Sequence, residues 1–293
     1  MKLFVRLGAV MVLAAGLLPA DVSFQQTTKF LGGTLIDMMQ KMASMPMMGR
    51  MMGGQQAAFQ DQHYDVYLKG NKMARWGKLN STIYDLDAGT ITTINNAKQT
   101  YSATTFEEMQ QRMEKMQERM NKGQQGDMEF DIKVSSTGQT QVIDGATAKE
   151  TLIVMTAKQA SAQGQMVVTT HAWLVPNKPE YKEIGEFQKK LAAKYAYAFS
   201  GGGMGMAQTG KAMSEAMNQT MKQDGYPVLT DVVISGVAPA GPMAGMGGGE
   251  NADPNAPLMK VETTSDHFAA SGADDSKFAV PAGYKEEKRR GDR

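Results

Sequence analysis

The sequence predicts an α+β fold in which a few helices pack on one side of an antiparallel sheet. Residues 62–103 contain five short extended runs that are joined by turns of two to four residues. Connections this short join only antiparallel neighbours. Segments with helical spacing interrupt the strands in a few places and do not follow every strand, which is unlike a series of βαβ units. The 293 residues allow a sizeable core, and they contain no convincing internal repeat or domain boundary.

The first twenty residues have the pattern of a secretory signal peptide. Lys2 and Arg6 give a positive start, the apolar run 7–18 follows, and Leu-Pro-Ala ends at Ala20. We expect cleavage after Ala20 and a periplasmic or secreted protein. A retained membrane anchor is the alternative, although the apolar run is short for a bilayer.

The N-terminal part of the mature chain combines a strand with a methionine-rich insert. Alternation over 21–30 predicts the strand. The insert, 34–54, opens with helical spacing of Leu35, Met38, Met39 and Met42, and Pro46 should end that helix. The meander at 62–103 follows, with one face on a core and the other in water.

A capped helix comes after the meander. Thr104 or Thr105 should cap it, with Glu107 and Glu108 in its first turn, and it should run to about Lys122. Extended segments are then predicted at 128–137, 139–143, 147–157 and 165–175.

The pattern of the C-terminal half of the sequence predicts two more helices and the last strands of the sheet. The helices are expected at 180–199 and 207–223, and the strands at 227–235, 258–268 and 277–280. Residues 236–256, rich in Gly, Pro, Ala and Met, should form a long loop. A single domain is therefore expected over 21–285, followed by a charged tail at 286–293.

Composition and motifs argue against several classes of function. The net charge of +1 lacks the basic excess that phosphate binding needs, and the absence of cysteine excludes disulfides, thiolate metal sites and Cys nucleophiles. The sequence has no G-x-S-x-G elbow, H-E-x-x-H motif or phosphate loop. His63, His171 and His267 lie far apart on predicted strands. We therefore expect neither an enzyme nor a bound cofactor.

Methionine is the unusual residue, with 26 in the chain. A stripe on the helix after the meander consists of Phe106, Met109, Met113, Met116 and Met120. Such a stripe is often ordinary core packing. It also suits an adaptable apolar surface, because thioether side chains repack around varied ligands, and the segments 34–54 and 204–221 are methionine-rich as well.

Two other functions are compatible with these features. Thioethers select Cu(I), and the insert holds clustered methionines, although none of the clusters contains histidine. Periplasmic Cu(I) or redox handling is one alternative, since exposed methionine is also readily oxidised. A structural envelope protein without a ligand is the other.

Several segments resemble a family of uncharacterised secreted bacterial proteins. The segments are YLKGNKMARW, STIYDLDAGTITTINNAKQTYSATTFEEM, IDGATAKETLIVMT, TTHAWLVPNKPEYKEIGEF and SKFAVPAGYKE. That family is similar in pattern to the periplasmic lipoprotein carriers LolA and LolB. The resemblance implies an unclosed antiparallel half-barrel of roughly ten strands, covered by a helical lid over an apolar cavity. Carriers of this type depend on an arginine in an early strand that contacts the lid, and Arg75 is the nearest candidate.

The leading prediction is an exported protein that holds an acyl chain, lipid or lipoprotein between sheet and lid, with a possible transient partner in the envelope. The expected lining from the helices is Met109, Met113, Met116, Met120, Phe187, Met213, Met217 and Met221. The sheet should contribute Tyr67, Trp76, Tyr84 and Tyr101.

Overall fold

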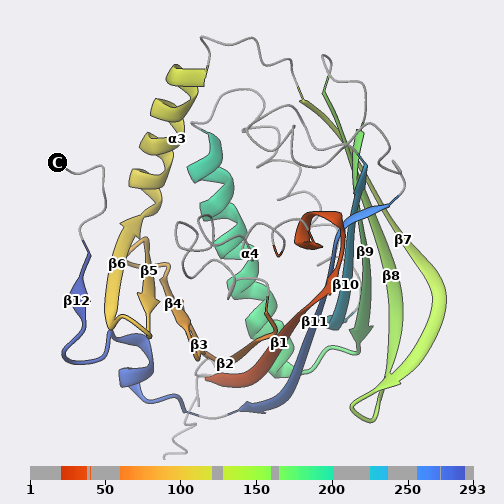
Figure 1. The fold of residues 1–293 in the computed structure, drawn as a ribbon. Helices are drawn as coiled ribbons and strands as arrows, with labels where there is room; N and C mark the ends of the chain where they lie inside the picture. Colours follow the sequence, from red (N-terminus) through yellow and green to blue (C-terminus); the bar gives the residue numbers. More distant parts are fainter. Residues whose placement is uncertain are drawn as a thin grey trace, which may run out of the picture.

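A twelve-stranded, unclosed sheet dominates the computed structural model (Figure 1). The structure describes residues 21–37, 40, 60–120, 128–159, 165–200, 225–236, 256–270 and 272–287. The strand order is β12-β6-β5-β4-β3-β2-β1-β11-β10-β9-β8-β7. Neighbouring strands pair antiparallel, except that β12 runs parallel to β6. The expectation of a large, unclosed antiparallel sheet is confirmed.

The strands and helices have the following bounds. The strands are β1 Val22–Gly32, β2 Gln62–Lys69, β3 Lys72–Gly77, β4 Asn80–Asp85, β5 Thr90–Asn95, β6 Thr100–Thr105, β7 Met128–Ile143, β8 Ala146–Gln159, β9 Gln165–Val175, β10 Tyr226–Gly236, β11 Pro257–Ala270 and β12 Lys285–Glu286. The helices are α3 Phe106–Met120, α4 Pro179–Ser200 and the short 3₁₀ helix η2 Asp275–Phe278.

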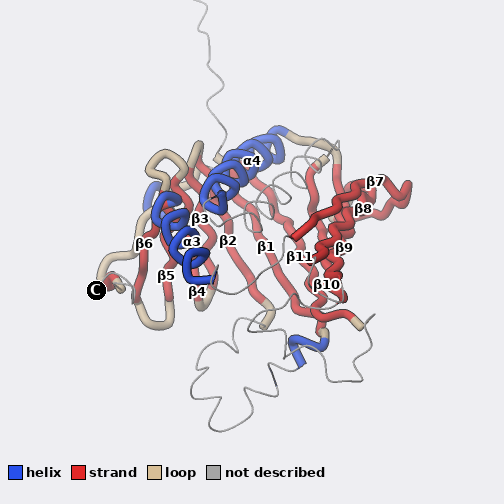
Figure 2. Tube along the Cα trace, turned by 90° about the horizontal axis from the view of Figure 1, so that it is seen from above, coloured by secondary structure: helices blue, strands red, loops and turns tan. Residues whose placement is uncertain are grey.

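Strand β1 joins two antiparallel runs into one sheet. It pairs with β2 on one side, where the meander β2–β6 begins, and with β11 on the other, where the run β11–β7 begins. Figure 2 shows that α3 and α4 lie on the same side of the sheet and that β7–β10 curve toward that side. We call the side toward α4 the inner face and the opposite side the outer face.

The main core lies between α4 and the inner face. Ile184 and Phe187 of α4 are almost fully buried, and they belong to one cluster with Val22 and Phe24 of β1 and Leu68 of β2. Removing side chains of this size from water supplies roughly 1.5–3 kcal/mol each, so this cluster fixes α4 on the sheet.

A second core lies on the outer face of the meander. It contains Ala74, Ile83 and Ile94, and the C-terminal segment covers it with Phe278, Val280 and Tyr284. Alternation along β3 separates the two cores, because Met73 belongs to the inner cluster and Ala74 to the outer one. The meander is therefore apolar on both faces, where the sequence predicted that one face would be in water.

The C-terminal segment, 272–287, crosses the outer face as a strap. The indole N–H of Trp76 donates to the carbonyl oxygen of Lys277 at 2.9 Å, and the Lys69 ammonium lies 2.8 Å from a carboxylate oxygen of Asp275. The predicted strand at 277–280 is wrong. The carboxylate of Asp274 accepts the N–H of Ser276 at 2.8 Å, so the chain forms η2 there instead.

Other local expectations have mixed outcomes. Thr105 caps α3, and residues 34–37 are helical, as expected at the start of the insert. The segments 128–137 and 139–143 form the single strand β7, which contains a register shift between Ser136 and Thr140. Lys285 and Glu286 form β12, so the predicted tail begins inside the sheet. The signal peptide, the rest of the insert, the helix at 207–223 and the loop at 237–255 lie outside the described residues.

Among the described helices, none combines the length and apolar character that crossing a membrane requires.

Candidate ligand-binding face

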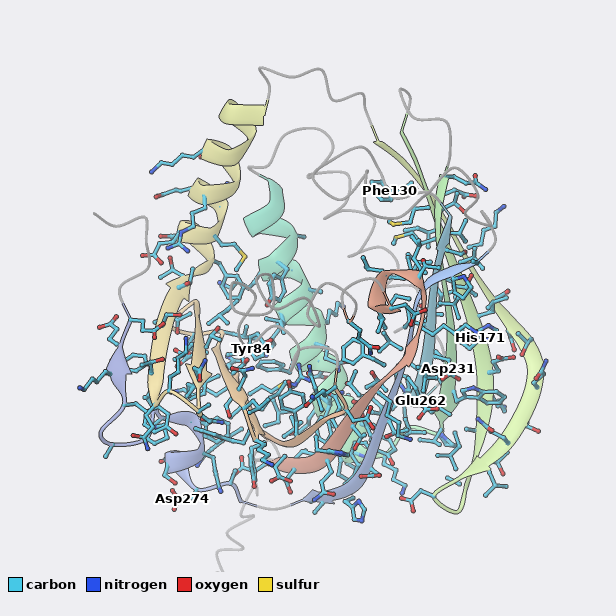
Figure 3. All side chains as sticks on the ribbon, viewed as in Figure 1. Tyr84, Phe130, His171, Asp231, Glu262 and Asp274 are labelled. Atoms are coloured by element: carbon cyan, nitrogen blue, oxygen red, sulfur yellow. The ribbon has the colours of Figure 1, made fainter. Side chains whose placement is uncertain are left out.

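Strand β7 shows which side of the second half of the sheet is apolar. Phe130, Ile132 and Val134 are half-buried, whereas the intervening Asp131, Lys133 and Ser135 are exposed. Figure 3 shows Phe130 directed toward the inner side of the curved sheet. Side chains alternate along a strand, so Ile132 and Val134 share that side.

The register extends this pattern across the neighbouring strands. Cross-strand partners lie on the same face, so three rows can be followed from β7 toward β1. The first row is Ile132, Met155, Val168, Ile234 and Met259. The second is Val134, Ile153, Thr170, Val232, Val261 and Phe30, and the third is Phe130, Ala157 and Met166.

We call these three rows the inner apolar face. Thr170 is its single polar member, and every member is half-buried except Ala157, which is buried. The rows cross up to six strands, or about 24 Å at roughly 4.8 Å per strand step. A surface of this width is large enough to contact an elongated apolar molecule along its length.

A row of small and hydroxyl side chains borders the inner apolar face. It consists of Thr28, Thr263, Thr230, Ala172, Thr151 and Ser136. Thr28 and Thr263 are hydrogen-bonded to each other at 3.3 Å. The inner side of these strands therefore changes from polar to apolar along the strand direction.

The outer face of the same strands carries charges. Lys29, Glu262, Asp231 and His171 are successive cross-strand partners on β1, β11, β10 and β9, and the last three are labelled in Figure 3. The Lys29 ammonium lies 3.0 Å from Glu262, and a ring nitrogen of His171 lies 2.6 Å from the Glu150 carboxylate.

Two carboxylates have pKa values shifted in opposite directions: Asp231 in this row, and Glu150, which lies beside the row and contacts His171. The hydroxyl of Thr137 donates to Glu150 at 2.5 Å and, together with His171, lowers the pKa of that carboxyl against the effect of burial. Burial raises the pKa of Asp231, and the negative charges of Glu262 and Glu150 raise it further. Such a row is costly to cover with apolar material, so the inner face is the better candidate for an apolar ligand.

Arg75 lies on the inner side of β3. Its guanidinium carbon is 4.4 Å from the centre of the Tyr64 ring, and its Nε is buried without a hydrogen-bond partner among the described residues. Burial raises the pKa of Tyr195 on α4, Tyr84 raises it further, and the charge of Arg75 opposes both. Arg75 is therefore close enough to α4 for its charge to act on the Tyr195 hydroxyl.

The structure brings together only some of the predicted lining residues. Phe187 is in the inner core, and Met109 and Tyr84 pack against that core. The helix α3 also contains Met113, Met116 and Met120. Outside the described residues are Met213, Met217 and Met221.

Trp76 and Tyr101 are on the wrong face for the predicted lining. Both pack against the outer core, and Tyr67 is also on the outer face, where the Lys277 ammonium lies 4.9 Å from the centre of its ring. They alternate with inner residues along their strands, so they cannot share a ligand surface with Phe187.

Sequence reasoning missed the inner apolar face. Its signal was present in the segment FDIKV, which alternates apolar and charged residues over 130–134. The segments of β8, β9 and β10 do not alternate as clearly, so only the register reveals the rows.

No metal centre is evident in the part of the chain that the structure describes, since no three His, Asp or Glu side chains are grouped to hold an ion there. No protein-family model matches the sequence, and no curated protein matches it either.

Proposed function

We propose that this chain is an exported binding protein, and not an enzyme, that holds an acyl chain, lipid or lipoprotein against the inner apolar face. One observation carries the proposal: the inner side of these six strands has three half-buried rows with a single polar member, whereas the outer side mixes apolar side chains such as Val154 and Val233 with a row of charged side chains. An apolar side that is only half-buried gains free energy when a ligand covers it, at roughly 0.8 kcal/mol for each methylene group removed from water.

The position of the helices supports the same proposal. The inner core occupies the part of the sheet under α4, and it does not include the half-buried rows on β7–β11. In this arrangement α3 and α4 would act as the lid of a LolA-like half-barrel, with Arg75 at the contact between sheet and lid. Met109 of α3 packs against the inner core, so α3 is held to α4 and the sheet at its first turn.

Matched substitutions on two adjacent residues of β9 test the proposal. Val168 is on the inner apolar face, and its neighbour Val167 is on the outer face; both are half-buried. We expect Val168→Asp to abolish binding of a 16-carbon fatty acid, because a carboxylate would replace apolar contact. Val167→Asp should retain it. Circular dichroism and thermal unfolding would show that both variants are folded.

Native mass spectrometry of the mature protein, followed by lipid extraction, provides the direct measurement. Bound acyl species that the fatty acid displaces would support the proposal and identify the class of ligand. Equal binding by the two variants would refute the assignment to the inner face. A protein that ignores lipid but gains mass with Cu(I) would favour the metal-handling alternative, and one inert to both would favour a structural role.

A further inference from the structure

The two edges of the sheet differ in length. At one edge, β12 contributes two residues, Lys285 and Glu286, whose side chains are exposed and charged. At the other edge, β7 is 16 residues long and pairs with β8 alone among the described strands. Long unpaired edges offer free backbone N–H and C=O groups to another strand, and proteins usually block them with prolines, charges or bulges.

The regular part of the β7 edge is nine residues long. Pairing with β8 is continuous from Met128 to Ser136, and the register shift follows there. This segment contains neither proline nor glycine, and its midpoint is Ile132. In an antiparallel ladder, alternate residues turn their backbone groups away from the existing partner, so this segment can accept a second strand along its whole length.

The same segment is complementary to itself. If two copies pair antiparallel with Ile132 opposite Ile132, then Asp131 lies opposite Lys133 and Lys133 opposite Asp131. On the inner side, Phe130 lies opposite Val134. Within one copy, the Asp131 carboxylate and the Lys133 ammonium are 3.3 Å apart, with side chains 57% and 77% exposed, so both charges are accessible to a partner.

We propose that two copies of this chain associate edge to edge through residues 128–136 of β7, about a two-fold axis at Ile132. The contact is isologous, with the same patch on both subunits, and closes at a dimer. The two sheets become one continuous sheet, and the apolar row that contains Ile132 runs across the axis. The proposal does not depend on ligand binding.

Charge reversal tests the pairing on the outer side. Sedimentation velocity of the mature full-length protein should show a dimer. Asp131→Lys alone, or Lys133→Asp alone, turns both attractive pairs into repulsive ones and should weaken association at least about tenfold. An equimolar mixture of the two variants restores opposite charges at both positions, and it should form heterodimers.

Single cysteines test the register, because the natural chain has none. Ile132→Cys places two cysteines opposite each other at a Cα separation of about 4.5–5.5 Å, which allows a disulfide under mild oxidation. Val134→Cys is the matched control on the same face. Its two copies would be four residues apart along the strands, about 13 Å, and should not cross-link.

The expected results are a wild-type dimer, two weakened variants whose mixture associates, and cross-linking at 132 without cross-linking at 134. A wild-type protein that stays monomeric up to about millimolar concentration would overturn the proposal. A dimer that neither charge reversal weakens, or that cross-links equally well through both positions, would also overturn it. Circular dichroism of each variant shows whether a loss of association reflects the edge or a loss of folding.

Discussion

The capping box of α3 gives a prediction that can be worked out from two hydrogen bonds. The hydroxyl oxygen of Thr105 accepts the backbone N–H of Glu108 at 3.0 Å, and a carboxylate oxygen of Glu108 accepts the backbone N–H of Thr105 at 3.1 Å. Thr105→Ala removes the first bond and frees the carboxylate from the second. Loss of an N-terminal cap costs about 1 kcal/mol of helix stability.

The loss should be local to α3. This helix has 15 residues, and the inner core includes its Phe106 and contacts its Met109. A helix of that length is marginal by itself, so α3 depends on its cap and on these contacts near its start. A loss of about 1 kcal/mol corresponds to roughly fivefold faster exchange of the α3 amides through local opening.

Hydrogen exchange followed by mass spectrometry measures this effect on a peptide that covers 106–120. Thr105→Ser is the matched control, since it keeps a hydroxyl at the cap and should keep most of the protection. Peptides from β1 and β2 provide the internal reference. Unchanged exchange in α3, or an equal loss of protection in α3 and in β1, would refute the reasoning.

Three further substitutions test the inner core and the carboxylates of the outer face. Phe187→Ala should lower the free energy of unfolding in urea by about 3–5 kcal/mol, because Phe187 is only 2% exposed in the inner core. Glu150 has a lowered pKa, so its ionisation stabilises the fold above its ordinary pKa of 4.5. The stability lost in Glu150→Gln should therefore shrink as the pH falls below that value. Asp231 has a raised pKa, so its ionisation destabilises the fold as the pH rises above 3.8. Asp231→Asn should be more stable than wild type at pH 7 and equal to it in acid, and a pH-independent difference would contradict the assignment.

The meander and the α3 cap were predictable because their signals are local. Gly70 and Asn71 form the turn between β2 and β3, and the extended runs on either side are rich in aromatic and β-branched residues. The capping box also lies within four residues of sequence, between Thr105 and Glu108. Interactions of this range depend on few residues, and they leave a pattern that can be read directly.

The face on which Trp76 lies could not be predicted in the same way. Both faces of β3 are apolar, since Met73 supports the inner core and Ala74 the outer one. The outer apolar face is covered by the strap. Lys277 of the strap accepts the Trp76 hydrogen bond and lies 201 residues away in sequence. Alternation alone cannot show which of two apolar faces meets the helices.

The same reasoning explains why the candidate site is on β7–β11 and not on the meander. The strap and α4 cover the meander from its two sides, so its apolar side chains already have partners. On β7–β11 the outer side carries the charged row, and the inner side carries the half-buried apolar rows. Ligand binding and edge pairing share Phe130, Ile132 and Val134, but each also has residues of its own. Val168→Asp should therefore remove ligand and leave the dimer, whereas Lys133→Asp should weaken the dimer and leave ligand binding. If either substitution removed both properties, the inner apolar face and the β7 edge would have to act as one site, and the division of the sheet argued here would be wrong.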